Sequence, residues 1–338
     1  MLSRRHALKT IAASGLIPLT RVHAADPIPL RVNLLGYALG IHMPTTAALL
    51  DLMPALGYTP QTRRMDQMRT LTQTLVAGAA DLGETDPITT MSAVESGADL
   101  KIVGLWYHQT DLVFVANADR VHDLQDLTNP KNLVAVNDKG DITDVMMVGT
   151  LLKHGLDPSK VQIVEIGGSG GRMRALLSGR VQAVPVHFDQ AADVAKQGNF
   201  KILFKPWVEL PGWVNEVWVT RGDWLSKKEN QRAVVELLKS EMSCFRKADD
   251  DINWFTDVYH KYATLPDAKK ATAESLRPLW DGLKNEVNAW PRVAELRVED
   301  FQNLVPLYQK AGAIKSDLKA EKIVEPSFAQ QAAWELGA

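Results

Sequence analysis

Two short polar clusters in this 338-residue chain contain residue types that could carry out chemistry. In the first, His187 and Asp189 stand two residues apart, and such a pair can act as a general base or as part of a metal site. In the second, Glu84 and Asp86 flank Thr85, and two carboxylates this close could bind an amine or the ring N–H groups of a ligand. Thr85 or Asp86 also fits a second role, as the N-cap of a helix that begins directly after them.

A glycine-rich stretch, VEIGGSGGRMRALLSG at 164–179, joins a strand-like run to a helix-like run, as in nucleotide-binding sites. Gly168 and Gly170 match the first two positions of a G-x-G-x-x-G fingerprint, and Asp189 lies about where an acid would hold a ribose. The third position holds methionine, so we expect no nucleotide cofactor. Two interpretations stay open: a plain turn, or a loop whose backbone N–H groups approach a ligand at a helix start, with Arg172 adding charge.

A complete catalytic or metal-binding set is missing from the sequence. There is no G-x-S-x-G elbow, and the single cysteine, Cys244, falls in a C-terminal helical region far from the polar loops. The remaining histidines are scattered and lack the spacing of metal ligands. We therefore expect no metal, no cofactor and no enzyme activity, and we interpret His187 and Asp189 as polar groups that face a cleft or a hinge.

The elements that must position these groups alternate between strand and helix. Period-two or short apolar runs predict strands, and 3.6-residue periodicity predicts the helices between them. Strands are expected at 30–34, 100–105, 111–116 and 133–136, with others before the glycine loop, at 181–189 and near 200–220. Helices are expected from about 44, 68, 87 and 143, after the glycine loop, and over most of the chain beyond 226. This alternation predicts an α/β fold with sheets rich in parallel strands and helices on both faces.

Ligands of such folds bind where loops leave the carboxyl ends of strands. Two groups of such loops fall on either side of about residue 120, which predicts two lobes facing across a cleft. Aromatic residues in these loops, Trp106 and Tyr107, could stack on a flat ligand or could belong to the core, and the same choice applies to Trp213. Asp141 and Ile142 could contact a ligand, although Asp141 also suits a helix N-cap.

The N-terminal segment 1–24 has the build of an export signal, with a basic start, a short apolar middle and a small-residue end. Its apolar part, 11–19, is too short to span a bilayer, and cleavage is expected after Ala24. Arg4 and Arg5 resemble a twin-arginine signal, although Ala7 stands where that pattern usually has phenylalanine. An ordinary secretory signal remains the alternative.

Charge and cysteine usage limit the partners and the means of stabilisation. Removal of the four basic residues of the signal changes the formal net charge from −2 to −6, which argues against nucleic acid or an anionic membrane as a partner. One cysteine cannot form an intramolecular disulfide, so the core must supply the stability. A mature chain of about 314 residues is long enough for two lobes.

Several stretches together resemble the periplasmic substrate-binding proteins of the sulfonate, nitrate, taurine and thiamine-precursor group. The stretch LVAGAADLGETDPITTMSAVESGADLKIVG (75–104) is similar to a helix, an "aDig" strand and a "GaDlkiV" strand of that group. The stretch from Val121 to Ile166 resembles its second-lobe entry, and 175–194 resembles its "al..G.vDA....p" stretch with Gln182 in place of the usual aspartate. The tail 298–328 resembles its closing helices.

The resemblance implies a two-lobe, type II-like periplasmic-binding-protein fold with a ligand cleft between the lobes. It implies one lobe formed by 25–118 and 212–338 and a second formed by 119–211. It implies a monomeric receptor that clamps a small organic solute and delivers it to an ABC permease and its ATPase, without nucleic acid or direct membrane insertion. The alternative is an enzyme on the same fold, such as a desulfinase-like or pyrimidine-synthesis-like protein.

Ligand-binding residues are expected in the loops of both lobes. The carboxylates there outnumber the single arginine, which favours a flat or amine-bearing organic ligand. The expected contacts are Tyr37, His42, Glu84, Thr85, Asp86, Trp106, Tyr107, Asp141, Ile142, Gly168, Ser169, Arg172, His187, Asp189 and Trp213.

Overall fold

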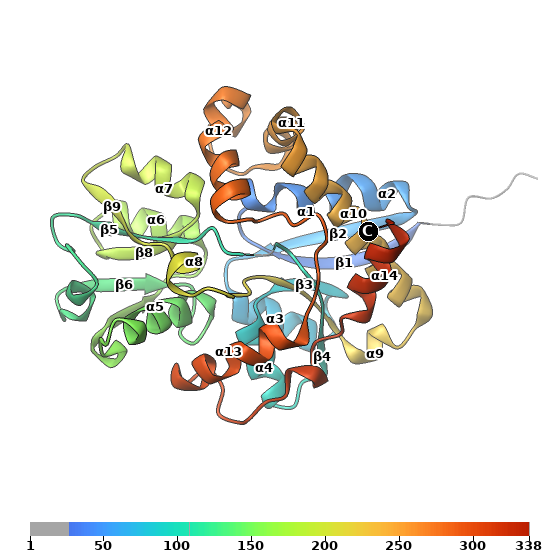
Figure 1. The fold of residues 1–338 in the computed structure, drawn as a ribbon, viewed down its shortest axis with the longest axis horizontal. Coiled ribbons are helices and arrows are strands. Elements are labelled where there is room, and N and C mark those ends of the chain that lie inside the picture. The colour runs from blue at the N-terminus through green and yellow to red at the C-terminus, as the bar shows by residue number, and fades with distance from the viewer. Residues whose placement is uncertain (1–26, 108, 338) are drawn as a thin grey trace, which may run out of the picture.

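Two five-stranded sheets, each flanked by helices, form the two lobes of the molecule (Figure 1). The computed structural model describes residues 27–107 and 109–337. The expected export signal, with Arg4, Arg5 and its cleavage site, lies outside the described residues. The two-lobe α/β architecture expected from the sequence is confirmed.

The first sheet contains both parallel and antiparallel strands. Its order is β2 (Tyr58–Met65), β1 (Ile28–Leu35), β3 (Leu82–Thr85), β10 (Val217–Arg221) and β4 (Leu100–Leu105). β1 is parallel to β2 and β3, whereas β10 is antiparallel to β3 and β4. In β1 the alternation of the sequence places Leu30, Val32 and Leu34 in the core.

The second sheet repeats this arrangement. Its order is β7 (Gln162–Glu165), β6 (Leu133–Val136), β8 (Ala183–Val186), β5 (Val113–Asn117) and β9 (Phe200–Phe204). β6 is parallel to β7 and β8, and β5 is antiparallel to β8 and β9. Each sheet is therefore mixed, because one antiparallel strand enters it immediately after the chain has crossed from the other sheet.

The chain passes between the sheets twice, between β4 and β5 and again between β9 and β10. Because β5 pairs with β8 and β9, the first crossing precedes Val113. The predicted boundary at residue 118 assigned β5 to the first lobe, whereas its pairing places β5 in the sheet of the second lobe. Sequence analysis placed that strand with its neighbour β4 because the two are adjacent along the chain.

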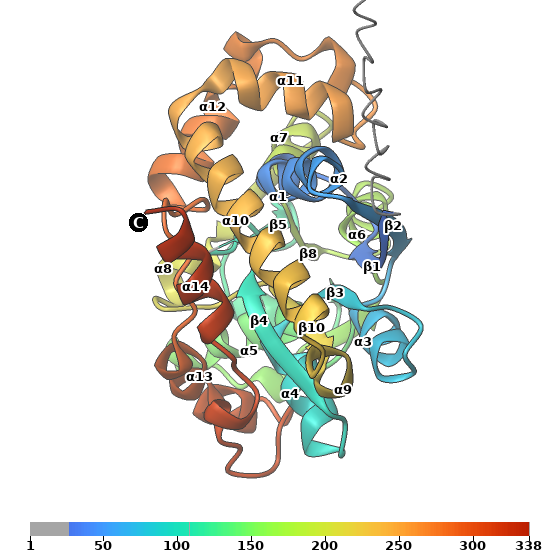
Figure 2. The same ribbon diagram turned by 90° about the vertical axis from the view of Figure 1, so that its right-hand side faces the viewer.

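Helices cover both faces of each sheet. Those of the first lobe are α1 (Met43–Ala47), α2 (Met53–Ala55), α3 (Met68–Val76), α4 (Pro87–Glu95), α9 (Gly222–Leu225) and α10 (Lys228–Asp250). Those of the second lobe are α5 (Ile142–Lys153), α6 (Ser169–Leu177), α7 (Phe188–Ala195) and α8 (Pro206–Glu209). The short 3-10 helix η1 (Gly40–His42) leads into α1. Figure 2 shows the long helix α10 between α9 and α11, lying across the first lobe.

The C-terminal helices contact both lobes. They are α11 (Ile252–Tyr262), α12 (Ala273–Asp281), α13 (Val298–Lys310) and α14 (Ser327–Glu335). Leu307 of α13 packs close to Gly149 of α5. Beyond α12, Gly282 lies against Phe188 of the second lobe, and Glu286 forms an ion pair with Lys205 at 2.6 Å. The C-terminal segment therefore contacts the second lobe at two places, near α5 and near α7 and α8.

The hydrophobic core extends through both lobes. A smaller cluster lies where α6 and α7 cover one face of the second sheet, and a larger one contains the first lobe, the C-terminal helices and the other face of the second sheet. Cys244 of α10 belongs to the larger cluster, and burial raises the pKa of its thiol to about 12. Within residues 27–107 and 109–337, no helix combines the length and the apolar composition needed to cross a bilayer.

Candidate ligand-binding site

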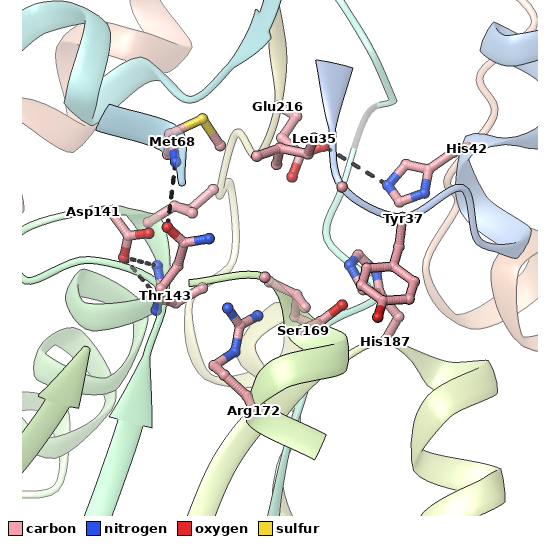
Figure 3. Close-up of a pocket in the computed structure, with 15 residues that line it drawn as sticks. Leu35, Tyr37, His42, Met68, Asp141, Thr143, Ser169, Arg172, His187 and Glu216 are labelled. Carbon is pink, nitrogen blue, oxygen red and sulfur yellow. Dashed lines mark hydrogen bonds and ion pairs between the residues drawn. The ribbon is translucent and has the colours of Figure 1, made fainter. Parts of the chain in front are cut away.

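A cavity with both polar and apolar lining residues lies between the two lobes, and both sheets contribute to its wall (Figure 3). Its volume is about 40 Å³, whereas a single buried water molecule needs roughly 10–15 Å³. A solute of more than a few atoms would therefore require the two walls to move apart. The lining residues are Leu35, Gly36, Tyr37, His42, Met68, Leu112, Asn137, Asp141, Ile142, Thr143, Gly168, Ser169, Arg172, His187 and Glu216.

Strand direction explains why these residues meet. The loops that follow β1, β6, β7 and β8 all open towards the cavity, because the carboxyl ends of parallel strands lie on one edge of a sheet. The antiparallel strands bring their amino ends to the same edges. Val217 at the start of β10 pairs with Thr85 at the end of β3, which places Glu216 at this edge. In the second sheet, Val113 pairs with Val186, which places Leu112 and His187 together.

Hydrogen bonds hold the lobes together around the cavity. The side-chain amide of Asn137 donates to the carbonyl of Asp66 at 3.1 Å, and its oxygen accepts from the backbone N–H of Met68 at 3.4 Å. The backbone N–H of Gly40 donates to Asp189 Oδ2 at 2.9 Å. These contacts join the loops of one lobe directly to those of the other.

Arg172 supplies a buried positive charge to the cavity wall. Its side chain is held by two backbone carbonyls: Nε donates to Pro185 at 2.9 Å, and Nη1 donates to Gly167. Among the described residues, none forms an ion pair with this guanidinium at contact distance. Burial lowers the pKa of Arg172 to about 10, although the nearby charge of Asp141 opposes that shift. Arg172 therefore remains charged at neutral pH and is available to a negatively charged or acceptor group of a ligand.

The glycine loop forms the start of α6, and two of its residues, Gly168 and Ser169, line the cavity. Gly168 has φ −55°, and an added Cβ there would meet no protein atom nearer than Asp66 Oδ1 at 3.5 Å. A close approach occurs at Gly170, where an added Cβ would lie 2.6 Å from Tyr37 Cε2 and closer still to Cζ and Oη. Gly167 is the residue with positive φ, at 75°.

Asp141 is the N-cap of α5 and also lines the cavity. It caps α5, because Oδ1 accepts from the backbone N–H of Thr143 at 2.9 Å and of Asp144 at 3.2 Å. It also lines the cavity together with Ile142. Burial, together with the charge of Asp86, raises the pKa of Asp141 to about 8, so this carboxyl is largely protonated at neutral pH.

Asp86 caps a helix, whereas its neighbour Thr85 packs in the interior. Asp86 caps α4 by accepting from the backbone N–H of Thr89 at 2.6 Å and from its hydroxyl at 2.9 Å. Burial raises the pKa of Asp86 to about 6. Thr85 is buried, and its hydroxyl pairs with that of Thr72 at 3.0 Å. Neither Thr85 nor Asp86 lines the cavity, so the structure places them behind its wall.

Two buried glutamates lie at the first-lobe end of the cavity. Glu84 is 1% exposed and Glu216 is 3% exposed, and Glu84 Oε2 accepts from the backbone N–H of Leu35 at 2.7 Å. Burial raises the pKa of both carboxyls, and for Glu216 the charge of Glu84 adds to the rise. Figure 3 marks the approach of Glu216 Oε2 to His42 Nε2, at 3.9 Å.

The three side chains of His42, Glu84 and Glu216 place ligand-type atoms within 4.8 Å of one another, a spacing that suits a metal ion. The hydrogen bonding of His42 does not fit such a site. Its Nδ1 accepts from the backbone N–H of Leu39 at 3.0 Å, so the neutral ring carries its proton on Nε2 and has no lone pair there for a metal. Burial lowers the pKa of His42 well below its ordinary value, so the ring is neutral.

His187 pairs with a residue that sequence analysis did not select. Its Nδ1 lies 2.6 Å from Asp111 Oδ1, whereas Asp189, the expected neighbour, accepts from Gly40 across the cleft. Burial alone would lower the pKa of His187, but the charge and hydrogen bond of Asp111 raise it overall. Burial and the charge of Asp111 raise the pKa of Asp189 to about 6. His187 therefore lines the cavity, while Asp189 joins the two lobes.

The three expected aromatic contacts lie in the core beside the cavity. Trp106 packs against Trp218 with ring centroids 4.8 Å apart. Asn215 connects the other two, since its amide donates to the hydroxyl of Tyr107 at 2.7 Å and accepts from Trp213 Nε1 at 3.2 Å. Of the two interpretations that the sequence left open, core residue or stacking contact, the positions of these three aromatic residues agree with the first.

Of the expected contact residues, eight line the cavity: Tyr37, His42, Asp141, Ile142, Gly168, Ser169, Arg172 and His187. Glu84, Thr85, Asp86, Trp106, Tyr107, Asp189 and Trp213 are buried next to it. The most informative omission is Glu216, which precedes a strand. Recognising that an antiparallel strand brings its amino end to the cavity would have revealed it. Asn137 and Thr143 lie in or beside a loop that the sequence did select.

The sequence of this chain matches a known protein family. Residues 66–241, just over half of the chain, match the protein family described as NMT1/THI5 like. The chain belongs to this family. Among curated protein sequences, none matches this NMT1/THI5-like chain.

Solved structures resemble this NMT1/THI5-like protein over almost its whole length. The periplasmic nitrate-binding protein NrtA from Synechocystis PCC 6803 has a TM-score of 0.74 at 14% identity, covering 92% of this chain and 89% of that one. The ligand-binding component of an ABC-type import system from Staphylococcus aureus, with zinc bound, has a TM-score of 0.73 at 15% identity, covering 90% and 99%. The alkanesulfonate-binding protein SsuA from Xanthomonas axonopodis pv. citri, bound to MOPS, has a TM-score of 0.70 at 14% identity, covering 89% and 99%. At these identities the likeness establishes the fold.

Proposed function

We propose that this protein is the solute-binding receptor of an ABC importer and that it closes its two lobes over a small, polar organic ligand. The observation that carries the proposal is the cavity built jointly by the loop ends of the two sheets. Family membership and the fold shared with binding components of import systems point the same way.

The wall of the cavity suits a ligand with two kinds of polar group. Arg172, Ser169 and the start of α6 offer a positive charge and hydrogen-bond donors at one end. Glu216, with Glu84 behind it, offers carboxyl oxygens at the other. The nitrate-binding and alkanesulfonate-binding neighbours bind oxyanions, and only the Arg172 end of this cavity suits such a group.

A receptor of this kind would act outside the inner membrane. The proposal therefore includes export by the segment 1–24, with twin-arginine export preferred on the strength of Arg4 and Arg5, and a mature periplasmic protein. It also includes a permease and its ATPase as partners, a monomeric state, and no role for nucleic acid.

The alternative, an enzyme on this fold, has one observation in its favour: the His187–Asp111 pair could act as a general base. Nucleophilic catalysis would also need an activated thiol or hydroxyl group nearby. Cys244 is buried in α10 away from the cavity, and its raised pKa keeps it protonated. Among the described residues, no hydrogen bond joins the hydroxyl of Ser169 or Thr143 to His187. The receptor assignment needs no such group, and we therefore prefer it.

A thermal-shift screen of the mature protein against a library of small solutes tests the proposal. A solute at about 100 times its Kd should add roughly 2.7 kcal/mol to the free energy of unfolding. The solute that stabilises the protein should also be taken up by cells, and deletion of the gene should abolish that uptake. Uptake that is unaffected by the deletion would contradict the receptor role.

A further inference from the structure

The carboxyl pair of Glu84 and Glu216 has hydrogen-bonding capacity that the protein leaves unused. Glu84 Oε1, Glu216 Oε2 and His42 Nε2 are buried atoms without a hydrogen-bond partner among the described residues. Each of the three residues is at least nine-tenths buried. Because a buried polar group without a partner costs about 1–3 kcal/mol, three of them meeting at a cavity indicate a binding site for a ligand group.

Charge decides what kind of group this site binds. Two carboxylates this close cannot both stay ionised in a buried site unless a positive charge or a proton lies between them. Burial and mutual repulsion raise the pKa of Glu216 well above its ordinary value, in keeping with one proton held by the pair. Glu216, which lines the cavity, therefore holds the proton, and the remaining negative charge lies on Glu84 beside it.

The groups around the pair leave that negative charge without a direct ion-pair partner. From β2, Arg64 stabilises the charge of Glu84, but its guanidinium donates to the carbonyl of Leu35 at 2.7 Å. Near the end of β4, Tyr107 favours the ionised form of Glu216 and is itself neutral, because burial raises its pKa well above the ordinary value. His42 is neutral, and its Nε2 lies 3.9 Å from Glu216 Oε2, too far for a hydrogen bond.

From the second lobe, His187 carries charge that favours the ionised form of Glu84. It is, however, already paired with Asp111 at 2.6 Å. The charge of Asp111 raises the pKa of Glu216 further. The second lobe therefore supplies a balanced pair and a further cation, Arg172, which acts on Glu216 through space from the other end of the cavity and forms no ion pair with it among the described residues.

The geometry suits a nitrogen that donates to both carboxyl groups. The ligand-type atoms lie within 4.8 Å of one another, and a nitrogen at about 2.7–3.2 Å from two acceptors can bridge that separation. An oxyanion would meet the negative charge of the pair, and a metal ion would meet the protonated Nε2 of His42. Neither of those ligands fits as well as an ammonium or amidinium group.

We propose that the pair of Glu84 and Glu216 holds one proton in the free protein and binds a nitrogen-centred cation of the solute, which displaces that proton. The cation donates one N–H to each carboxylate, and the displaced proton leaves to solvent, so that one positive charge replaces another. This inference rests on the proposed receptor function and assigns the solute to the class of ammonium or amidinium compounds. Its affinity rises with pH, because the proton competes with the cation for the same two oxygens.

The test uses four simple probes on the mature protein: methylammonium and acetamidinium chloride as cations, and sodium nitrate and sodium methanesulfonate as oxyanions, at equal ionic strength. We expect the cations to raise the melting temperature more at pH 8 than at pH 6, and the oxyanions to have no comparable effect. Titration calorimetry of methylammonium in two buffers with different ionisation enthalpies should show that close to one proton is released per cation bound.

Variants separate the carboxyl pair from general effects of charge. Glu216→Gln should reduce the affinity for both cations at least tenfold, and so should Glu84→Gln. The matched control is Glu241→Gln, since Glu241 is an equally buried glutamate that bonds Thr45 and Trp218 in the core and does not line the cavity. This control should leave cation binding unchanged.

Three results would overturn the proposal: no stabilisation by either cation, equal cation affinity in Glu216→Gln, or stabilisation by the oxyanions instead of the cations. Each is distinct from failure of the receptor role. If a library solute binds and is imported while the cation tests fail, the receptor function stands and only the assigned ligand class is wrong.

Discussion

Gly170→Ala is the change that tests the closed arrangement of the cavity most sharply. Gly170 lies in α6 of the second lobe, and Tyr37 lies in the loop after β1 of the first lobe. A Cβ at position 170 would lie 2.6 Å from Tyr37 Cε2 and closer to Cζ and Oη, below the 3.0 Å that real Cβ atoms essentially never breach. The ring of Tyr37 must therefore move, or the lobes must stay further apart.

The expected cost follows from this overlap. Overpacking by one methyl group typically costs about 1–3 kcal/mol. Because the clash arises only where the lobes meet, most of this cost should appear in ligand affinity, as a loss of roughly 5- to 150-fold at about 1.4 kcal/mol per factor of ten. The stability of the ligand-free protein should change less. Titration calorimetry with the solute from the thermal-shift screen measures the first quantity, and urea unfolding without solute measures the second.

Gly168→Ala is the matched control, two residues earlier in the same loop. An added Cβ there meets Asp66 Oδ1 at an ordinary 3.5 Å, and the backbone φ of −55° suits alanine. We expect near wild-type affinity for this variant. If Gly170→Ala binds the solute as tightly as wild type and as Gly168→Ala, the two lobes do not close with Tyr37 against α6, and the reasoning fails.

Three further predictions concern charge and export. Arg172→Lys should lower the free energy of unfolding by about 1–2 kcal/mol in urea, because a lysine cannot donate to both Pro185 and Gly167 as the guanidinium does; unchanged stability would mean that those two bonds are dispensable. Asp141 has a pKa of about 8 in the folded protein, above its unfolded value, so its contribution to stability is present at low pH and is lost as pH rises through 8. Wild type should therefore lose more stability between pH 5 and 8 than Asp141→Asn, and parallel pH curves would refute this. Changing Arg4 and Arg5 to lysine should leave the precursor in the cytoplasm, and normal processing after Ala24 would instead indicate the general secretory route.

Periodicity predicted most elements but missed several, including β2 and α7. The strands at 100–105 and 133–136 were predicted with the bounds that the structure gives, because both are short apolar runs. β2 was missed because Tyr58–Met65 is largely polar and exposed and contains Pro60, as edge strands often do. α7 was missed because its apolar face is only about two turns long. Short elements and solvent-exposed elements carry a weak pattern of apolar residues, and predictions from periodicity depend on that pattern.

Local sequence predicted half of the cavity wall, and strand pairing supplied much of the rest. Residues after parallel strands, such as Arg172 and His187, follow directly from the loop rule. Glu216 and Leu112 precede antiparallel strands, and only the sheet order brings them to the cavity. The partnership of His187 with Asp111 joins residues 76 positions apart, whereas Asp189 was favoured only because it is near in sequence.

The aromatic side chains illustrate a further limit of the sequence. Trp106 and Tyr107 directly follow β4 beside the cavity, but the backbone there directs them into the core against Trp218 and Asn215. A loop position indicates that a residue lies near a ligand site. The direction of its side chain depends on packing that no local pattern contains.

The most direct test of the receptor function is titration calorimetry of the mature protein with the stabilising solute, followed by mass spectrometry of the solute recovered from the complex. The account predicts saturable binding of one solute per chain, with the solute recovered chemically unchanged after prolonged incubation. Steady conversion of the solute into a product would contradict the receptor function and would favour an enzyme on this fold.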